Sequence, residues 1–162
     1  LTNFYMFVIK KYKFKKENNN KVEDNKLPVF TEKVNLKAKW TYSKIDKLEG
    51  YDIGIKEGHK LMTSHMTQLH EILNKNNIKM SLAVYPWPHQ LNNDIENSLQ
   101  VTIWKEFCES RCENFINYFT IFFNDMNNSS FLDTYNKFYF KNDPHFNKSG
   151  HKILAKKLIE IF

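Results

Sequence analysis

The strongest constraint on the fold is an alternation of helical and extended patterns between residues 54 and 119. In residues 54–76, apolar side chains recur at spacings of three, four and seven, which predicts an amphipathic helix. Residues 78–85 are mostly apolar and end at a Pro-Trp-Pro sequence, which predicts a strand buried on both faces. The two patterns return as a helix in 98–112 and a strand in 114–119. This order predicts a parallel sheet with helices on its faces and an α/β fold class.

The rest of the chain divides near residue 35. Residues 1–35 hold a short apolar stretch, a group of lysines and a polar run, and are interpreted as an N-terminal segment with a polar linker or surface excursion. Residues 36–162 are interpreted as one α/β unit, in which 120–141 contribute one or two short helices and Asn147 caps a final helix. The first residue is Leu1 rather than Met, so we expect the chain to begin partway through a longer protein.

The charge pattern bears on the possible partners. The net charge is +6, but nearly all the basic residues are lysines and Arg111 is the single arginine, which argues against nucleic-acid readout by arginine forks. The lysines in 10–16 leave one alternative, a basic surface that binds anionic partners. No apolar run approaches the roughly 20 residues of a membrane span. We therefore expect neither a nucleic-acid partner nor a membrane span in this chain.

The cysteines and histidines are the candidates for a metal site. Cys108 and Cys112 are four residues apart, either as two buried thiols or as a bridge across a helix end, and no further ligands for zinc stand at suitable spacing. His59, His65 and His70 follow one another at spacings of six and five, which do not align on one side of a helix. The sequence therefore predicts no metal site, and we expect no cofactor.

The chemistry is concentrated in residues 142–155, between an aromatic run and the final helix. Asp143 and His145 are separated only by Pro144, which restricts the backbone between them. In this arrangement the carboxylate can accept a hydrogen bond from one imidazole nitrogen while the other nitrogen faces a cleft. Ser149, in the first turn of the helix, is expected to assist its capping. Asp143 and His145 are thus the predicted catalytic acid and base.

The sequence Asp-x-His-Phe-Asn-x-x-Gly-His before a C-terminal apolar helix resembles the last motif of SGNH (GDSL-type) hydrolases and of related polysaccharide O-acetyltransferases. The resemblance covers about residues 40–162. Asp143 and His145 match the family's acid and base, Asn147 matches the polar residue that opens the last helix, and Gly150 and His151 match the pair within it. The resemblance implies a three-layer α/β/α fold with a parallel flavodoxin-like sheet, of which this chain is the C-terminal portion.

The resemblance also implies an ester hydrolase or O-acyl (acetyl) transferase with a Ser-His-Asp triad. Its substrate would be an acylated small molecule or carbohydrate, and the cell envelope or periplasm is favoured over the cytoplasm. No Gly-Asp-Ser sequence occurs, so we expect the serine in a missing N-terminal part of the same protein and an inactive isolated chain. The alternative is a non-catalytic binding or assembly domain with the same fold.

An aromatic residue and two histidines lie near the predicted strand ends and the final helix. Trp87 and His89 follow the carboxyl end of a strand, the edge at which open α/β sheets bind ligands, and are candidates for substrate binding. Trp87 either flanks an acyl or sugar pocket or caps the core. His151 is expected to pack against the sheet or to bond a backbone carbonyl.

Overall fold

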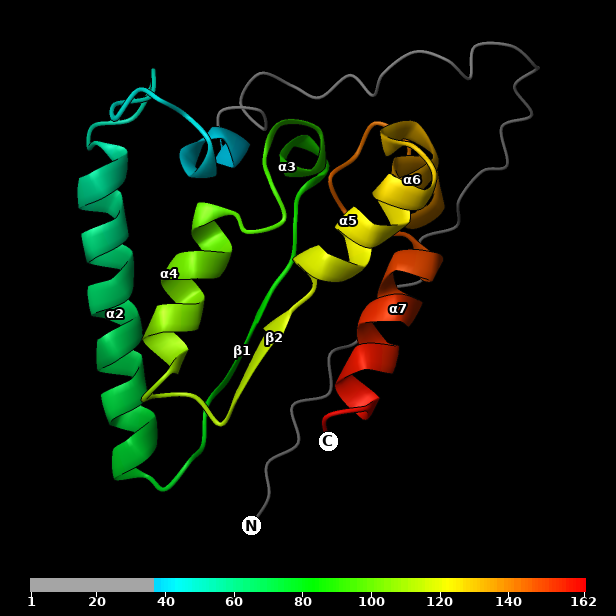
Figure 1. Ribbon diagram of the computed structural model, residues 1–162. Helices are drawn as coiled ribbons and strands as arrows, with labels where there is room; N and C mark the ends of the chain where they lie inside the picture. The colour runs from blue at the N-terminus through cyan, green and yellow to red at the C-terminus, as the bar shows by residue number, and fades with distance from the viewer. Residues whose placement is uncertain (1–36) are drawn as a thin grey trace, which may run out of the picture.

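The computed structural model describes residues 37–162, so the segment predicted for 1–35 and the basic surface proposed for 10–16 lie outside the described residues. The described part is mixed α/β (Figure 1). In chain order its elements are η1 (Lys39–Thr41), α2 (Ile55–Lys75), β1 (Ser81–Val84), α3 (Pro88–Asn93), α4 (Leu99–Cys108), β2 (Asn114–Asn117), α5 (Phe119–Asn128), α6 (Phe131–Phe138) and α7 (Lys148–Ile159).

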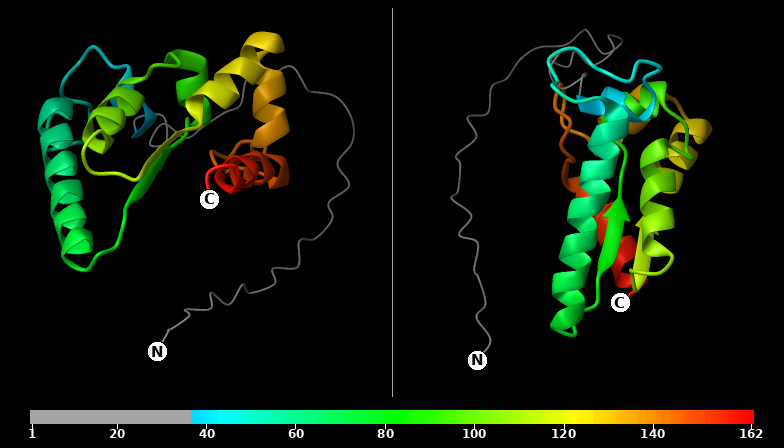
Figure 2. Two further views of the ribbon diagram at one scale, coloured as in Figure 1. Left: turned by 60° about the horizontal axis from the view of Figure 1, so that its bottom comes forward. Right: turned by 90° about the vertical axis from the view of Figure 1, so that its left-hand side faces the viewer.

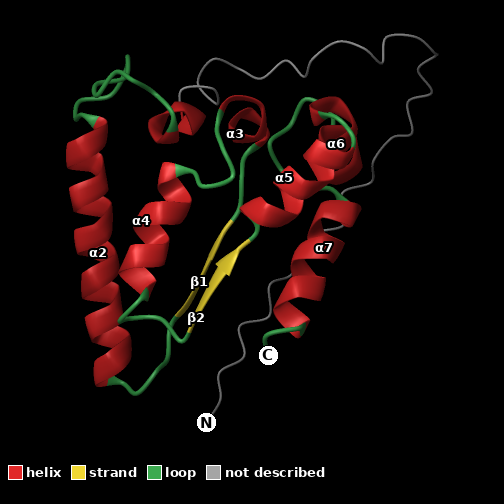
Figure 3. Ribbon diagram, in the orientation of Figure 1, coloured by secondary structure: helices red, strands yellow, loops and turns green. Residues whose placement is uncertain are grey.

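The two strands form a parallel pair, as the alternating pattern predicts. Their register runs from Ser81 opposite Asn114 to Val84 opposite Asn117. The connection between them holds α3 and α4, and α4 packs on both strands. Figures 1 and 3 show the strands between α4 on one side and α7 on the other, and the further views in Figure 2 agree. The sheet therefore has helices on either side of it.

The prediction that β1 is buried on both faces is wrong for the described residues. Val84 is 2% exposed and Leu82 packs partly against the core, whereas Ser81 and Ala83 are exposed. Successive side chains of a strand point to opposite faces, so one face of β1 is uncovered. The faces of a strand are buried by helices that pack on them, and no element within residues 37–162 buries Ser81 and Ala83.

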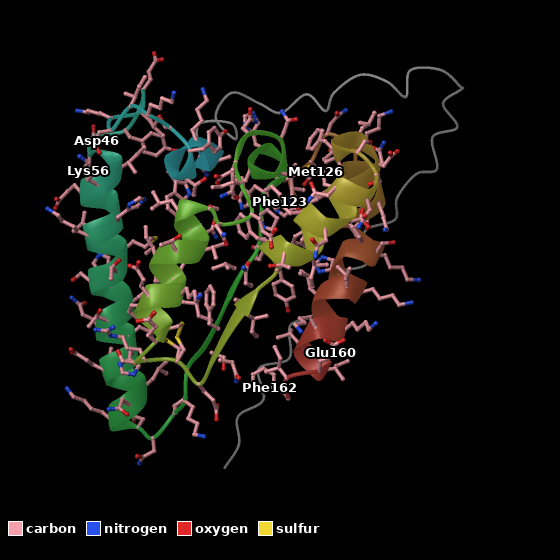
Figure 4. The ribbon with its side chains drawn as sticks, in the orientation of Figure 1. Asp46, Lys56, Phe123, Met126, Glu160 and Phe162 are labelled. Atoms are coloured by element: carbon pink, nitrogen blue, oxygen red, sulfur yellow. A yellow bond between two sulfur atoms is a disulfide. The ribbon has the colours of Figure 1, made fainter. Side chains whose placement is uncertain are left out.

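Helix α2 matches the predicted helix 54–76 closely. Its first turn is held by Asp46, whose carbonyl accepts from Ile55 N and whose carboxylate accepts from Lys56 N at 3.0 Å (Figure 4). The predicted apolar stripe is covered on one half only. Its inner residues Met62, Met66 and Leu73 pack against the core, whereas Leu61, Leu69 and Ile72 are exposed.

The second helix and strand are shorter than predicted. Helix α4 ends at Cys108, and a disulfide joins Cys108 to Cys112 across that end. Of the two alternatives for these cysteines, the structure therefore shows the disulfide and not two free thiols. Strand β2 stops at Asn117 because the Asn117 side chain accepts a hydrogen bond from Phe119 N at 2.9 Å and so helps to begin α5. The aromatic segment predicted to hold one or two short helices contains α6 and most of α5.

The core is strongly aromatic where α5, α6 and the following loop meet. Phe122 is fully buried, and its ring centroid lies 5.2 Å from those of Phe138 and Phe146. Tyr139 stacks on Tyr135 at 5.7 Å. Nearby on α5, Phe123 is also buried and Met126 packs against the same core (Figure 4). This cluster anchors the loop that carries the predicted catalytic residues.

Candidate active site

The loop between α6 and α7 is tightly closed on itself. Tyr139 and Phe146 form an antiparallel bridge, and Phe140 N donates to the His145 carbonyl at 3.0 Å. Inside this ring, Asp143 N donates to the Phe140 carbonyl at 3.1 Å. Asn142 makes the turn with φ 57°, a left-handed conformation that asparagine tolerates better than most residues. The backbone thus holds residues 143 and 145 side by side.

Asp143 and His145 make the contact that their spacing suggests. Asp143 Oδ1 lies 2.5 Å from His145 Nδ1 and accepts a hydrogen bond from His145 N at 2.7 Å. When Nδ1 carries the proton of the neutral ring, Nε2 is left as a proton acceptor. The His145 side chain is 81% exposed. The pair therefore presents a carboxylate-oriented imidazole at the surface of residues 37–162.

The electrostatics keep Asp143 ionised. The hydrogen bond from the His145 backbone N–H is the largest effect on its pKa, and the His145 side chain adds to it. Together they lower the pKa of Asp143 below its ordinary value, against a smaller opposing effect of burial. An ionised carboxylate at neutral pH is the state that stabilises a protonated imidazole next to it.

Asn147 and Gly150 explain why the loop ends where it does. Asn147 Oδ1 accepts from Ser149 N and Gly150 N and caps α7, as predicted, while its Nδ2 donates to the carbonyls of Lys137 and Tyr139. A Cβ at Gly150 would lie 2.4 Å from the Phe138 carbonyl oxygen. Only glycine permits this approach, so the two motif residues hold α7 against the end of α6.

The loop is tied to the carboxyl end of β1. The hydroxyl of Tyr139, a residue that is 2% exposed, donates to the Pro86 carbonyl at 2.9 Å. The ring of Tyr85 meets that of Phe146 edge-on at 5.3 Å. A pocket of about 400 Å³ opens beside this junction and is lined by Lys37, Tyr85, Trp87, Pro144, His145, Phe146 and His151.

The other sequence candidates have different outcomes. Trp87 lines the pocket with His145, whereas His89 is not among the lining residues and its Nδ1 lies 2.5 Å from the hydroxyl of Tyr42, the residue after η1. Burial lowers the pKa of His89. The expectation for His151 is wrong, because its side chain is exposed, meets Phe146 edge-on and lines the pocket. It lies in the first turn of α7, where its side chain lines the pocket instead of packing on the sheet.

Sequence reasoning missed Lys37, Tyr85 and Phe146 as pocket residues. Tyr85 and Phe146 flank residues that the motifs single out, Pro86 and His145, and adjacency was their only signal. No sequence pattern marks Lys37 as a pocket residue, because it belongs to the first described segment, far along the chain from the other lining residues.

None of the eight serines in the sequence lines the pocket with His145. Ser149 belongs to the capped turn of α7, where its backbone N–H bonds Asn147. His59 on α2 does not line this pocket; its ring meets that of Trp40 edge-on, and burial lowers its pKa. Within residues 37–162, no group of three or more His, Cys, Asp or Glu side chains is placed to hold a metal ion.

Comparisons with models of known protein families, with curated proteins and with solved structures found no match. Among the described helices, none combines the length and apolar character that crossing a membrane requires.

Proposed function

We propose that this chain supplies the base and the acid of a Ser-His-Asp triad in an ester hydrolase or O-acyl (acetyl) transferase of SGNH type. The observation that carries the proposal is the contact of Asp143 Oδ1 with Nδ1 of His145, whose side chain lines a pocket beside the carboxyl end of a parallel strand. Ligands of open α/β sheets bind at this edge. The substrate class is an acylated small molecule or carbohydrate.

Each residue has a defined part in the proposed reaction. A serine hydroxyl attacks the acyl carbonyl carbon while His145 Nε2 removes the hydroxyl proton, and the same proton later passes to the leaving alcohol. Asp143 holds the ring orientation and stabilises the imidazolium that forms between these steps. Water or a second hydroxyl then accepts the acyl group.

The serine is proposed to come from a part of the protein outside these 162 residues. This placement is supported by the absence of a serine from the pocket of His145. The finer fold is proposed with it: additional strands beside β1 would complete a parallel flavodoxin-like sheet in a three-layer α/β/α unit. The support for this addition is that β1 pairs with β2 on one side only within residues 37–162, which leaves its other edge open to a further strand.

The test uses the longest natural form of the protein. His145→Ala should lower the rate of acetyl-ester turnover by ~10³-fold, because the base is lost while binding remains. His65→Ala, an exposed histidine on α2, is the matched control and should leave the rate unchanged. Turnover by His145→Ala at the wild-type rate would refute the assignment.

The same preparation separates the enzyme from the non-catalytic alternative. A fluorophosphonate probe should label one serine of the longer protein and should leave the 162-residue chain unlabelled. A binding or assembly domain that retains the loop without the chemistry would show no labelled serine and no turnover in either form.

A further inference from the structure

The pocket beside His145 combines aromatic walls with basic groups. The rings of Tyr85, Trp87 and Phe146 form its apolar surface, and Lys37 and His151 supply its cationic and N–H donor groups. No Asp or Glu is among the lining residues. The nearest carboxylate along the chain is Asp143, whose Oδ1 already accepts from His145. The side chains that line the pocket therefore include basic groups and no carboxylate.

The two basic side chains have no acceptor of their own. In the part of the chain that the structure describes, neither the Lys37 ammonium nor the His151 ring takes part in a hydrogen bond or an ion pair. His151 stands in the first turn of α7, where the helix dipole adds positive potential. Binding sites of this size are mostly apolar, with a few polar groups that fix the orientation of the ligand.

We infer that the pocket selects an anionic ligand, an apolar or aromatic body that carries a carboxylate. The rings bind the body, and Lys37 and His151 bind the carboxylate by charge-assisted hydrogen bonds. The inference rests on the proposed function only in placing the reacting ester of such a substrate at His145. Binding of the anion itself needs no serine, so the 162-residue chain is sufficient for the test.

The experiment follows the tryptophan indole N–H signals by NMR during titration with 3-phenylpropionate and with its neutral amide, 3-phenylpropionamide. The signal of Trp87 in the pocket should shift, while that of Trp104 in the core should not. The carboxylate should bind about tenfold more tightly than the amide, because exposed charge pairs contribute at most a factor of about five each.

Variants assign the effect to the two basic residues. Lys37→Gln and His151→Gln should each weaken carboxylate binding by up to about fivefold and leave amide binding unchanged. Lys148→Gln removes an exposed charge from the same turn of α7 without touching the pocket, and should change neither affinity.

Three results would overturn the inference: equal affinity for the two ligands, an equal loss in Lys148→Gln, or binding of neither ligand. None of these results tests the proposed triad, which is tested by the turnover of His145→Ala. Conversely, selective carboxylate binding together with normal turnover in that variant would refute the triad alone.

Discussion

At the scale of single residues, the pKa of Asp143 is lowered more by a backbone N–H than by the imidazole that its carboxylate orients. The hydrogen bond from His145 N is the largest cause of its lowered pKa, ahead of the bond to the ring. Pro144 and the turn at Asn142 set this geometry locally. The lowered pKa of Asp143 therefore arises mainly within the loop itself.

The pKa of Asp143 should accordingly lie below its ordinary value of 3.8 in the wild-type chain. The folded state favours the carboxylate, so its contribution to stability is present at neutral pH and is lost as the pH falls through the folded pKa. In His145→Ala the pKa should rise but stay below 3.8, because the backbone N–H remains. NMR titration of the Asp143 carboxyl carbon measures both. A pKa of Asp143 that returned fully to 3.8 in His145→Ala would mean that the imidazole, not the backbone N–H, lowers it.

At the scale of elements, Gly150 allows α7 to lie close to the end of α6. Gly150→Ala should lower the free energy of unfolding by about 1–3 kcal/mol, since its Cβ would meet the Phe138 carbonyl oxygen at 2.4 Å. Gly58→Ala in α2 is the matched control, because the nearest atom to its Cβ is a side-chain carbon at 3.8 Å. That variant should be more stable by about 0.5–1 kcal/mol. Urea denaturation measures both, and opposite signs are the expected result.

The disulfide at the end of α4 acts at the same scale. Cys112→Ser should lower the free energy of unfolding by about 2 kcal/mol, because the bridge restricts the unfolded chain. Cys112 is the better position to change, since Cys108 is 5% exposed and a hydroxyl there would be buried. Dithiothreitol should destabilise the wild type by a similar amount and leave the variant unchanged. Equal stability of the oxidised and reduced wild type would contradict the prediction.

At the scale of the whole molecule, a hydrogen bond connects the loop between α6 and α7 to the segment that follows β1. The Tyr139 hydroxyl and the Pro86 carbonyl are 53 residues apart in the sequence. Tyr139→Phe leaves a buried carbonyl without this donor and should lower the free energy of unfolding by about 1–3 kcal/mol. Tyr51→Phe changes an exposed tyrosine and should stay within about 0.5 kcal/mol of the wild type. Thermal unfolding measures the stability of both variants. Equal unfolding temperatures for the two would mean that the hydrogen bond of Tyr139 does not stabilise the fold.

The sequence by itself determined the features that depend on close neighbours. The period of α2, the Asn147 cap and the contact of Asp143 with His145 each rest on residues at most four positions apart, where backbone geometry alone brings groups together. The parallel pairing also followed from the order of helix and strand patterns. These local rules predicted α2, the cap of α7, the strand pairing and the contact between Asp143 and His145.

The tertiary structure alone decided what surrounds that pair. Lys37, Tyr85 and His151 meet in one pocket from segments far apart in the sequence, and no local pattern relates them. The uncovered face of β1 and the exposed outer stripe of α2 have the same origin. Apolar periodicity specifies which face of an element is able to be buried, but only packing of distant segments determines whether a neighbour covers it.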